Sequence, residues 1–305
     1  MKKIINVYWY KVKLGYGNFG DELNCYLIQK LSGNRIRRII VPLSGIKYIY
    51  RCFRLLKYRI ISIIDIPKLI NQYFINDFIV AIGSVISIPN NKNAKIWGSG
   101  IIKRDDLINE AKFYAVRGKY TQNRLIELGF TPPKTLGDPA ILLPLVYKSN
   151  TDKKFKLGII PHHIHYKKIK DIVNNNEILI VDLTEKIEVV IDNINSCDYT
   201  ISTSLHGLIV SHVYNIPSIW FNFGGDSLFG DDIKFIDYFS SVNIKEYMPF
   251  PIIISEIQIQ DIITIFKSNI EKSKINCDLS LLQRDLIESA PFDIIDKYKN
   301  DSFIY

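Results

Sequence analysis

The chain lacks the features that mark a membrane-spanning, secreted or metal-stapled protein. No apolar run reaches the ~18 uncharged residues that a membrane-spanning helix needs. The opening MKKIINVYWYKVK has no apolar core followed by a small-residue cleavage site, so we expect a cytoplasmic protein. The four cysteines stand apart without a CxxC pair, which argues against a disulfide framework or a zinc site.

The composition that remains is that of a folded globular protein. Apolar residues make up 47% and charged residues 23% of the 305 residues, which excludes a disordered or collagen-like chain. A chain of this length usually forms two domains, because single cores stop growing at roughly 250–300 residues. The net charge of +8 suits nucleic acid, an anionic membrane or an anionic substrate.

Apolar segments of strand length alternate with helical periods in two series, a pattern typical of βα units on parallel sheets. The predicted strands are residues 3–10, 78–83, 95–97, 113–116, 156–160, 177–181, 199–202 and 218–221. A polar stretch at residues 147–154 separates the series. We therefore predict an α/β fold with two Rossmann-like domains, residues 1–150 and 151–305. Ligands are expected in the cleft between them, beyond the carboxyl ends of the strands.

A glycine-rich loop, GYGNFG at residues 15–20, follows the first predicted strand and matches the dinucleotide-binding pattern. No acid stands about 20 residues on to bind a ribose, although the arginines of residues 35–38 would suit a 2′-phosphate. Asp21 and Glu22 occupy the predicted helix start, where they would repel a pyrophosphate. The loop is then either a tight turn with an acidic cap or the support of a general base at Asp21.

A second loop, STSLHG at residues 202–207, lies between a predicted strand and a helix. Ser and Thr are natural helix N-caps, and the free N–H groups behind them form an anion site. His206 falls in the first helical turn, which suits proton transfer near neutral pH. The alternative is that His206 only bonds to a neighbouring loop.

All five histidines fall between residues 162 and 212. His162 and His163 come where a predicted strand ends, so one of them is expected to face the cleft. Adjacent residues of an extended chain point to opposite faces, which argues against a shared metal ion, and we expect no metal. His212 is expected to serve packing or to lie on the surface.

Two further charged residues stand where predicted regular structure ends in the first half of the chain. Arg117 follows a predicted strand, where it either clamps a carboxylate or phosphate or forms a structural ion pair. Asp138 precedes a proline and is either a turn-former or a site residue.

A basic amphipathic helix is predicted over residues 46–60. Its cations, Lys47, Arg51, Arg54 and Lys57, recur at spacings of four, three and three, which places them on one face. Such a helix suits an anionic membrane surface, and the alternative is a solvated face on a packed helix.

Five of these segments together resemble the polysaccharide pyruvyl transferase family. They are GNFGDE (17–22), WGSG (97–100), AVRG (115–118), LGDP (136–139) and SLHGLI (204–209). They stand in the family's order over roughly residues 8–222. The resemblance implies a fold like the GT-B glycosyltransferases, phosphoenolpyruvate as the donor, a sugar hydroxyl pair as the acceptor, and a pyruvate ketal as the product.

The resemblance also implies roles for residues. His206 would be the acid or a phosphate ligand, and Asp21 the base. The expected substrate-binding residues are Asn18, Arg117, Lys119, Asp138, His162, His163, Ser204, Leu205 and Gly207. Many family members carry Arg where this chain has Ser204, so Arg117, Lys119 or the histidines at 162–165 would have to supply the positive charge.

The acceptor implied is a sugar of an exopolysaccharide or capsule, with lipid-linked and nucleotide-linked forms left open. Work at the inner face of a membrane would fit the basic helix, and no cofactor or nucleic acid is expected. Three alternatives remain: a GT-B glycosyltransferase with a nucleotide-sugar donor, an NADP-dependent enzyme, and a catalytically inactive protein that binds membranes.

Overall fold

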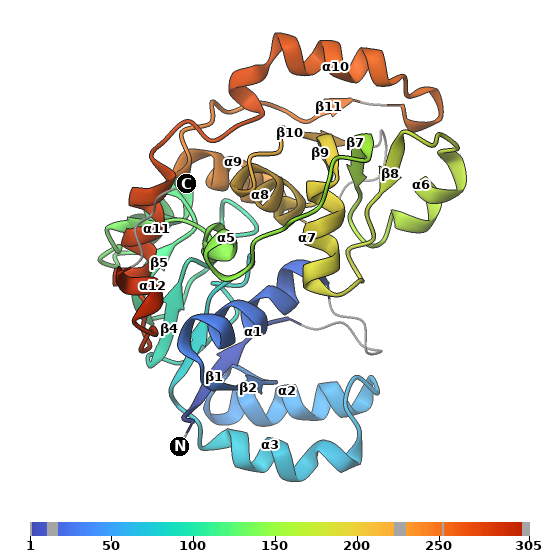
Figure 1. The fold of residues 1–305 in the computed structure, drawn as a ribbon. Coiled ribbons are helices and arrows are strands. Elements are labelled where there is room, and N and C mark those ends of the chain that lie inside the picture. Colours follow the sequence, from blue (N-terminus) through green and yellow to red (C-terminus); the bar gives the residue numbers. More distant parts are fainter. Residues whose placement is uncertain (1, 11–17, 223–229, 252, 301–305) are drawn as a thin grey trace.

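Two parallel sheets form the frame of the protein (Figure 1). The computed structural model describes residues 2–10, 18–222, 230–251 and 253–300. The first sheet has the order β2-β1-β3-β4-β5-β6 and the second β11-β10-β9-β7-β8, with every pair of neighbours parallel. The predicted α/β class is confirmed, and the sheets are consistent with Rossmann-like domains. The finer likeness to GT-B enzymes and the division at residue 150 stay predictions.

The strands of the first sheet are β1 (Ile4–Tyr8), β2 (Arg35–Ile39), β3 (Phe78–Val80), β4 (Ala94–Trp97), β5 (Lys112–Val116) and β6 (Thr135–Leu136). Those of the second are β7 (Phe155–Ile160), β8 (Ile178–Ile180), β9 (Cys197–Ser202), β10 (Ser218–Asn222) and β11 (Phe250–Pro251). The strand β2 escaped prediction because its sequence, RIRRI, is basic. It is an edge strand, where charged side chains reach solvent without disturbing the pairing.

The helices connect the strands. They are α1 (Phe19–Ser32), α2 (Gly45–Lys57), α3 (Ile66–Tyr73), α4 (Lys119–Glu127), α5 (Leu143–Val146), α6 (Tyr166–Ile172), α7 (Ile187–Asn195), α8 (Leu205–Val213), α9 (Ile233–Ser241), α10 (Ile259–Ser268), α11 (Leu279–Glu288) and α12 (Lys297–Asn300). Short 3₁₀ turns are η1 (Ile63–Asp65), η2 (Pro139–Leu142), η3 (Ile254–Glu256) and η4 (Ile270–Lys272). No helix in the described residues has the length and apolar character to cross a bilayer.

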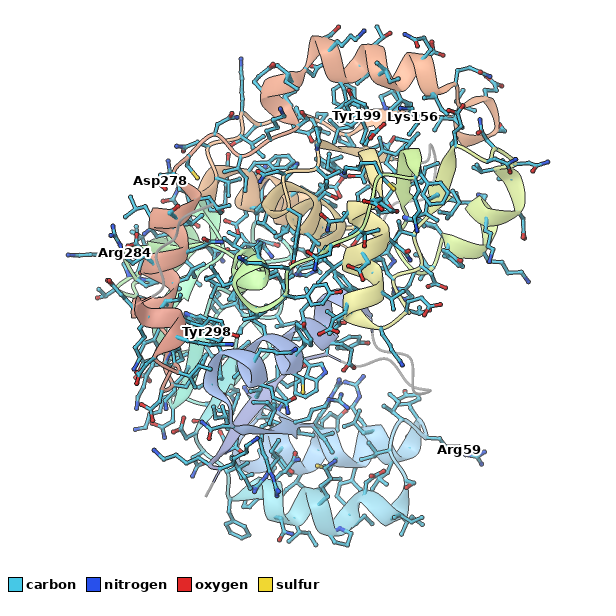
Figure 2. The ribbon with its side chains drawn as sticks, in the orientation of Figure 1. Arg59, Lys156, Tyr199, Asp278, Arg284 and Tyr298 are labelled. Atoms are coloured by element: carbon cyan, nitrogen blue, oxygen red, sulfur yellow. The ribbon has the colours of Figure 1, made fainter. Side chains whose placement is uncertain are left out.

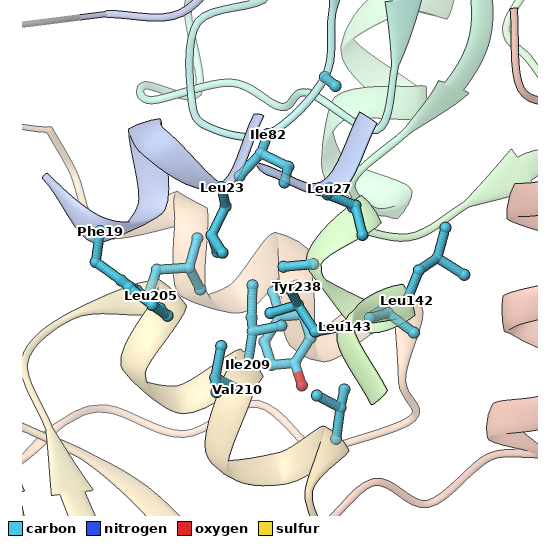
Figure 3. Close-up of a cluster of buried hydrophobic side chains, with 14 of the residues drawn as sticks. Phe19, Leu23, Leu27, Ile82, Leu142, Leu143, Leu205, Ile209, Val210 and Tyr238 are labelled. Atoms are coloured by element: carbon cyan, nitrogen blue, oxygen red, sulfur yellow. The ribbon is translucent and has the colours of Figure 1, made fainter. Parts of the chain in front are cut away.

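Helix α1 connects the half of the protein that contains the first sheet with the half that contains the second, through its apolar face. Its buried Leu23, Leu27 and Leu31 recur every four residues and so lie along one face. They belong to a hydrophobic core that also includes Leu205 and Ile209 of α8, together with residues of η2 and α5 (Figure 3). The helix ends at Gly33, whose φ of 66° lets its N–H bond to the carbonyl of Gln29.

The last helices return to the first sheet. The indole Nε1 of Trp97 in β4 donates to the carbonyl of Leu286 in α11 at 3.0 Å. Its ring meets Phe292 edge-on, with centroids 5.2 Å apart. The N–H of Ile295 donates to the carbonyl of Leu31 in α1 at 2.9 Å. These contacts tie residues 279–300 to the first sheet, although they follow the second in the chain.

We expect the protein to unfold in a single transition, because the core around α1 and α8 belongs to both halves. Leu27→Ala should lower the free energy of unfolding by about 2–5 kcal/mol, the usual cost of such a cavity. Ile4→Ala, at a half-exposed position of β1, should change it by less than about 0.5 kcal/mol. Urea unfolding followed by fluorescence and circular dichroism tests this, and two separated transitions would contradict it.

Candidate functional site

The candidate residues lie where each sheet reverses its strand order. In the first sheet the neighbours β1 and β3 mark that point, and in the second sheet β7 and β9 do. Chain connections leave such neighbours in opposite directions, which opens a place for a ligand at their carboxyl ends. Asp21 follows β1, His162 follows β7, and His206 follows β9. These residues follow the carboxyl ends of the strands, as the sequence predicted, and their role in binding stays a prediction.

Asp138 and His206 form a pair between the two halves. Asp138 caps η2, and its Oδ1 accepts from the N–H of Ala140 at 3.0 Å. Its Oδ2 lies 3.6 Å from Nε2 of His206, and the carboxylate is fully buried. Neither of these two atoms has a hydrogen-bond partner among the described residues. Asp138 therefore makes the capping bond of a turn-former and also lies beside His206, and its role as a site residue stays a prediction.

Gly20 is the reason that the His206 ring fits against α1. A Cβ at residue 20 would stand 2.1 Å from Nδ1 of His206 and 2.7 Å from its Cγ. Only glycine permits this approach, because the atom opposite belongs to a ring held between two helices. The last glycine of the GYGNFG loop thus accommodates a histidine ring. Gly15 and Gly17 lie outside the described residues.

Asp21 stands in the first turn of α1, beside His206. Burial raises the pKa of its carboxyl from its ordinary value to about 6, while the charge of His206 and a hydrogen bond from Asn18 oppose the rise. One oxygen, Oδ1, lies 4.0 Å from the position that a Cβ on Gly83 would occupy, in the loop after β3. A carboxyl that titrates near pH 6 is suited to accept a proton at neutral pH.

Arg117 forms a buried ion pair, which is the second of the two roles that the sequence analysis left open. Its guanidinium is fully buried, with Nε 3.0 Å from Oδ2 of Asp237 in α9. Nη1 donates to Oγ of Ser84 at 2.7 Å and Nη2 to the carbonyl of Ile101 at 2.6 Å. Its grip on a substrate anion stays a prediction, and these partners would compete with it.

Lys234 is a candidate that the sequence analysis missed. It lies in the first turn of α9 between the buried Ile233 and Phe235. Burial lowers the pKa of its ammonium to about 8, Arg117 adds to the fall, and Asp232 opposes it. The charge of Lys234 also lowers the pKa of His162, so the lysine is within electrostatic reach of both halves. A lysine between two apolar residues at a helix start was the only signal in the sequence.

The histidines after β7 pack against each other. The rings of His162 and His163 have centroids 4.3 Å apart, because the chain turns here and the N–H of His165 bonds to the carbonyl of His162. The argument that the two rings point to opposite faces was therefore wrong. Burial, with the neighbouring His163 and Lys234, lowers the pKa of His162 to about 3, so it is neutral at physiological pH.

No group of three or more His, Cys, Asp and Glu side chains in the described parts of the chain could hold a metal ion.

His212 serves packing, as expected. Its Nδ1 lies 3.0 Å from the hydroxyl of Tyr238, and its Nε2 2.9 Å from the carbonyl of Ser218.

The start of α8 is shaped by small residues. The N–H of Ser204 donates to Oγ of Ser202 at 3.0 Å, and the side chain of Ser204 makes no capping bond itself. A Cβ on Gly207 would stand 2.4 Å from that same Oγ, so glycine lets the helix pack closely against β9. Leu205 is buried in the shared core, beside Phe19 (Figure 3).

Lys119 lies apart from these residues. It is exposed at the start of α4 and lines a shallow pocket of about 530 Å³ with residues of α9 and the loop after it. Its N–H donates to Oγ of Ser240 at 2.9 Å. None of the residues around His206 lines this pocket.

Fold and site together describe an α/β protein with two parallel sheets, in which Asp138, His206 and Asp21 lie close together. A family model described as "Polysaccharide pyruvyl transferase" matches residues 18–224, more than half of the chain, and the chain belongs to that family. It is also similar to "Uncharacterized protein L143" of Acanthamoeba polyphaga mimivirus, with 36% identity over 172 residues. That match covers 54% of this chain, which spans only 60% of the relative's length.

Replacing the Asp21 carboxyl should change how stability depends on pH. Because the folded-state pKa lies above the ordinary value of 3.8, the wild type loses stability as pH rises from about 4 to about 7. Asp21→Asn removes that loss, so its free energy of unfolding relative to wild type should rise by roughly 2–3 kcal/mol across this range. Urea unfolding at several pH values measures it. Gln29→Ala, an exposed change in the same helix, is the control, and a pH-independent difference for Asp21→Asn would refute the assignment.

Proposed function

We propose that the protein transfers the enolpyruvyl group of phosphoenolpyruvate to two hydroxyls of a sugar, forming a pyruvate ketal and releasing phosphate. The observation that carries the proposal is the meeting of the Asp138–His206 pair with Asp21, in a chain of the polysaccharide pyruvyl transferase family. The reaction needs one group to give a proton and another to accept one, and this site supplies both.

The proposed steps conserve atoms and protons. The methylene carbon of phosphoenolpyruvate takes a proton and becomes the methyl group, which makes the adjacent carbon electrophilic. One sugar hydroxyl attacks that carbon and gives up its proton. The carbon–oxygen bond to phosphate breaks, phosphate leaves, and the second hydroxyl closes the ketal. Of the two hydroxyl protons, one replaces the proton used in the first step and the other leaves with phosphate.

We assign the proton donor to His206 and the acceptor to Asp21. Nε2 of His206 lies 3.6 Å from Oδ2 of Asp138 and has no hydrogen-bond partner among the described residues, so it is open to a substrate. Asp21, with a pKa of about 6, is largely ionised at pH 7.5 and still basic enough to take a hydroxyl proton. Unsatisfied buried groups of this kind are expected where a substrate completes the bonding.

We propose that Lys234 binds the negative charge of the donor, together with the N–H groups at the start of α8. Phosphoenolpyruvate carries a carboxylate and a phosphate, and the arginine that many family members have at this helix is Ser204 here. Lys234 lies within electrostatic reach of His162 and Arg117 and contributes the missing cation. His163, beside His162, is a second contact for the phosphate.

The acceptor we propose is a sugar of an exopolysaccharide or capsule, in lipid-linked form, met at the inner face of a membrane. The cations of α2 support the location, and a GT-B-like arrangement of the two sheets is part of the same proposal.

The direct test is phosphate release from phosphoenolpyruvate in the presence of a panel of lipid-linked sugars. We expect release only when a sugar with a free hydroxyl pair is present, and a ketal methyl signal in the product by NMR. Stabilisation against heat by nucleotide sugars, without any effect of phosphoenolpyruvate, would instead support a glycosyltransferase.

Lys234→Met should raise the KM for phosphoenolpyruvate by about 10–100-fold, the scale of losing one charged contact. The matched control is Lys119→Met, which removes a cation at the separate pocket beside α4 and should leave KM unchanged. Steady-state kinetics on both variants decides between the two lysines. Equal effects, or an effect of Lys119→Met alone, would contradict the assignment.

His206→Gln should lower kcat by roughly 100-fold or more, as expected for the loss of a general acid. Gly20→Ala should also lower kcat, because the new methyl group forces the His206 ring out of place. Gln29→Ala is the control in the same helix. A loss confined to KM would make His206 a phosphate ligand, and full activity would leave it a structural residue.

A further inference from the structure

Apolar side chains are concentrated on the surface of one helical hairpin. This hairpin, α2–η1–α3, lies at one end of the molecule, far from α10 (Figure 1). Half of the exposed large hydrophobic side chains in the described residues, eleven of 22, fall between residues 46 and 74. Among them Ile46 is 82%, Phe53 67%, Ile64 89% and Phe74 74% exposed. Such a concentration on a folded domain marks an interaction surface.

Helix α2 divides into three sides by its sequence spacing. Tyr48 and Leu55 are buried against the protein. Ile46, Ile49 and Phe53 recur at intervals of three and four on a side that is exposed. The cations Lys47, Arg51 and Arg54 occupy the side between these two. The helix therefore presents an exposed apolar side next to its cationic side. The sequence analysis predicted only the basic face.

Each exposed side borders a hollow. An apolar groove of about 350 Å³ lies between α2 and α3, lined by residues such as Phe53, Ile70 and Phe74. On the other side, Lys47, Arg51 and Arg54 line a pocket of about 650 Å³ together with Tyr8 and Tyr10 of the first strand's end. Among the described residues, no acidic side chain lines this cationic pocket.

We propose that the hairpin docks on an anionic lipid bilayer, with its exposed isoleucines and aromatic rings in the headgroup–acyl boundary and a lipid phosphate in the cationic pocket. Residues 45–76 carry six basic residues and one acidic residue, Asp65, which matches an anionic surface. Arg59, in the turn after α2, points away from the protein (Figure 2). The same charge would repel a second copy of this face. At 13 residues, about 20 Å, α2 is too short to span and fits an interfacial position.

Tyr8 is within electrostatic reach of both the cationic pocket and the candidate site. This residue ends β1, lines the pocket, and is close enough to Arg51, Arg38 and Asp21 for all three charges to act on its hydroxyl. A phosphate held by Arg51 would therefore place an attached sugar on the side of Asp21. This last step rests on the proposed function, whereas the bilayer contact does not.

Cosedimentation of the full chain with vesicles tests the inference. Wild type should bind vesicles of phosphatidylcholine with phosphatidylglycerol at least about 10-fold more strongly than phosphatidylcholine alone, with the preference lost at high salt. Ile63→Ser with Ile64→Ser should weaken binding to both vesicles about 10-fold or more. Arg51→Gln with Arg54→Gln should abolish the preference for phosphatidylglycerol. The controls are Leu107→Ser, at another exposed apolar position, and Lys267→Gln in α10, and both should bind as wild type does.

Absence of vesicle binding, or equal losses in the controls, would overturn the inference. So would a wild-type dimer that Ile63→Ser with Ile64→Ser converts to a monomer, since a second copy would then cover this face. Phosphate release with a water-soluble acceptor separates this result from the proposed reaction, because the Ile63 and Ile64 changes should leave it at the wild-type rate. Vesicle binding without any turnover would retain the bilayer contact and refute only the transferase.

Discussion

The apolar contact between α1 and α8 is the constraint on which the rest of the structure depends. Leu23 and Leu27 of α1 share a core with Leu205 and Ile209 of α8. Each helix follows a strand that lies where the strand order of its sheet reverses. Packing the helices together therefore brings the ends of two sheets face to face. Because protein cores are close-packed, the two helix starts have little freedom to move relative to each other. Such a fixed arrangement would suit the proton transfer that we propose.

The polar groups at this junction are buried, and their burial lowers the stability of the fold. Asp138 is fully buried, Asp21 has a raised pKa, and Lys234 and His162 have lowered ones, all through burial. Each such group destabilises the fold unless a partner compensates. The contrast with Arg117 is instructive, since its guanidinium has a carboxylate, a hydroxyl and a carbonyl as partners. Arg117 thus stabilises the frame, whereas the substrate contacts that we propose fall on groups with fewer partners.

The sequence predicted the features that depend on local pattern and missed those that depend on distant neighbours. Alternating apolar strands and helical periods predicted the α/β class, and strand-end positions indicated His206 and Asp21. The basic strand β2 was missed because its edge position, which tolerates arginine, is set by the order of the sheet. Lys234 was missed because its pKa depends on Arg117 and on burial between the halves. The histidines at 162 and 163 were misjudged because a turn, rather than an extended strand, carries them.

The glycine loop shows why a motif alone did not decide between functions. A glycine at a helix start signals that something must approach the backbone closely, and in dinucleotide-binding proteins that is a pyrophosphate. Here the space beside Gly20 holds the ring of His206. The local requirement is the same in both cases, so the local sequence is the same as well. Asp21 distinguishes them, because a carboxylate in the first turn would repel a phosphate but not a histidine ring. An acidic residue directly after such a glycine is therefore a local sign that a side chain, and not a nucleotide, lies opposite.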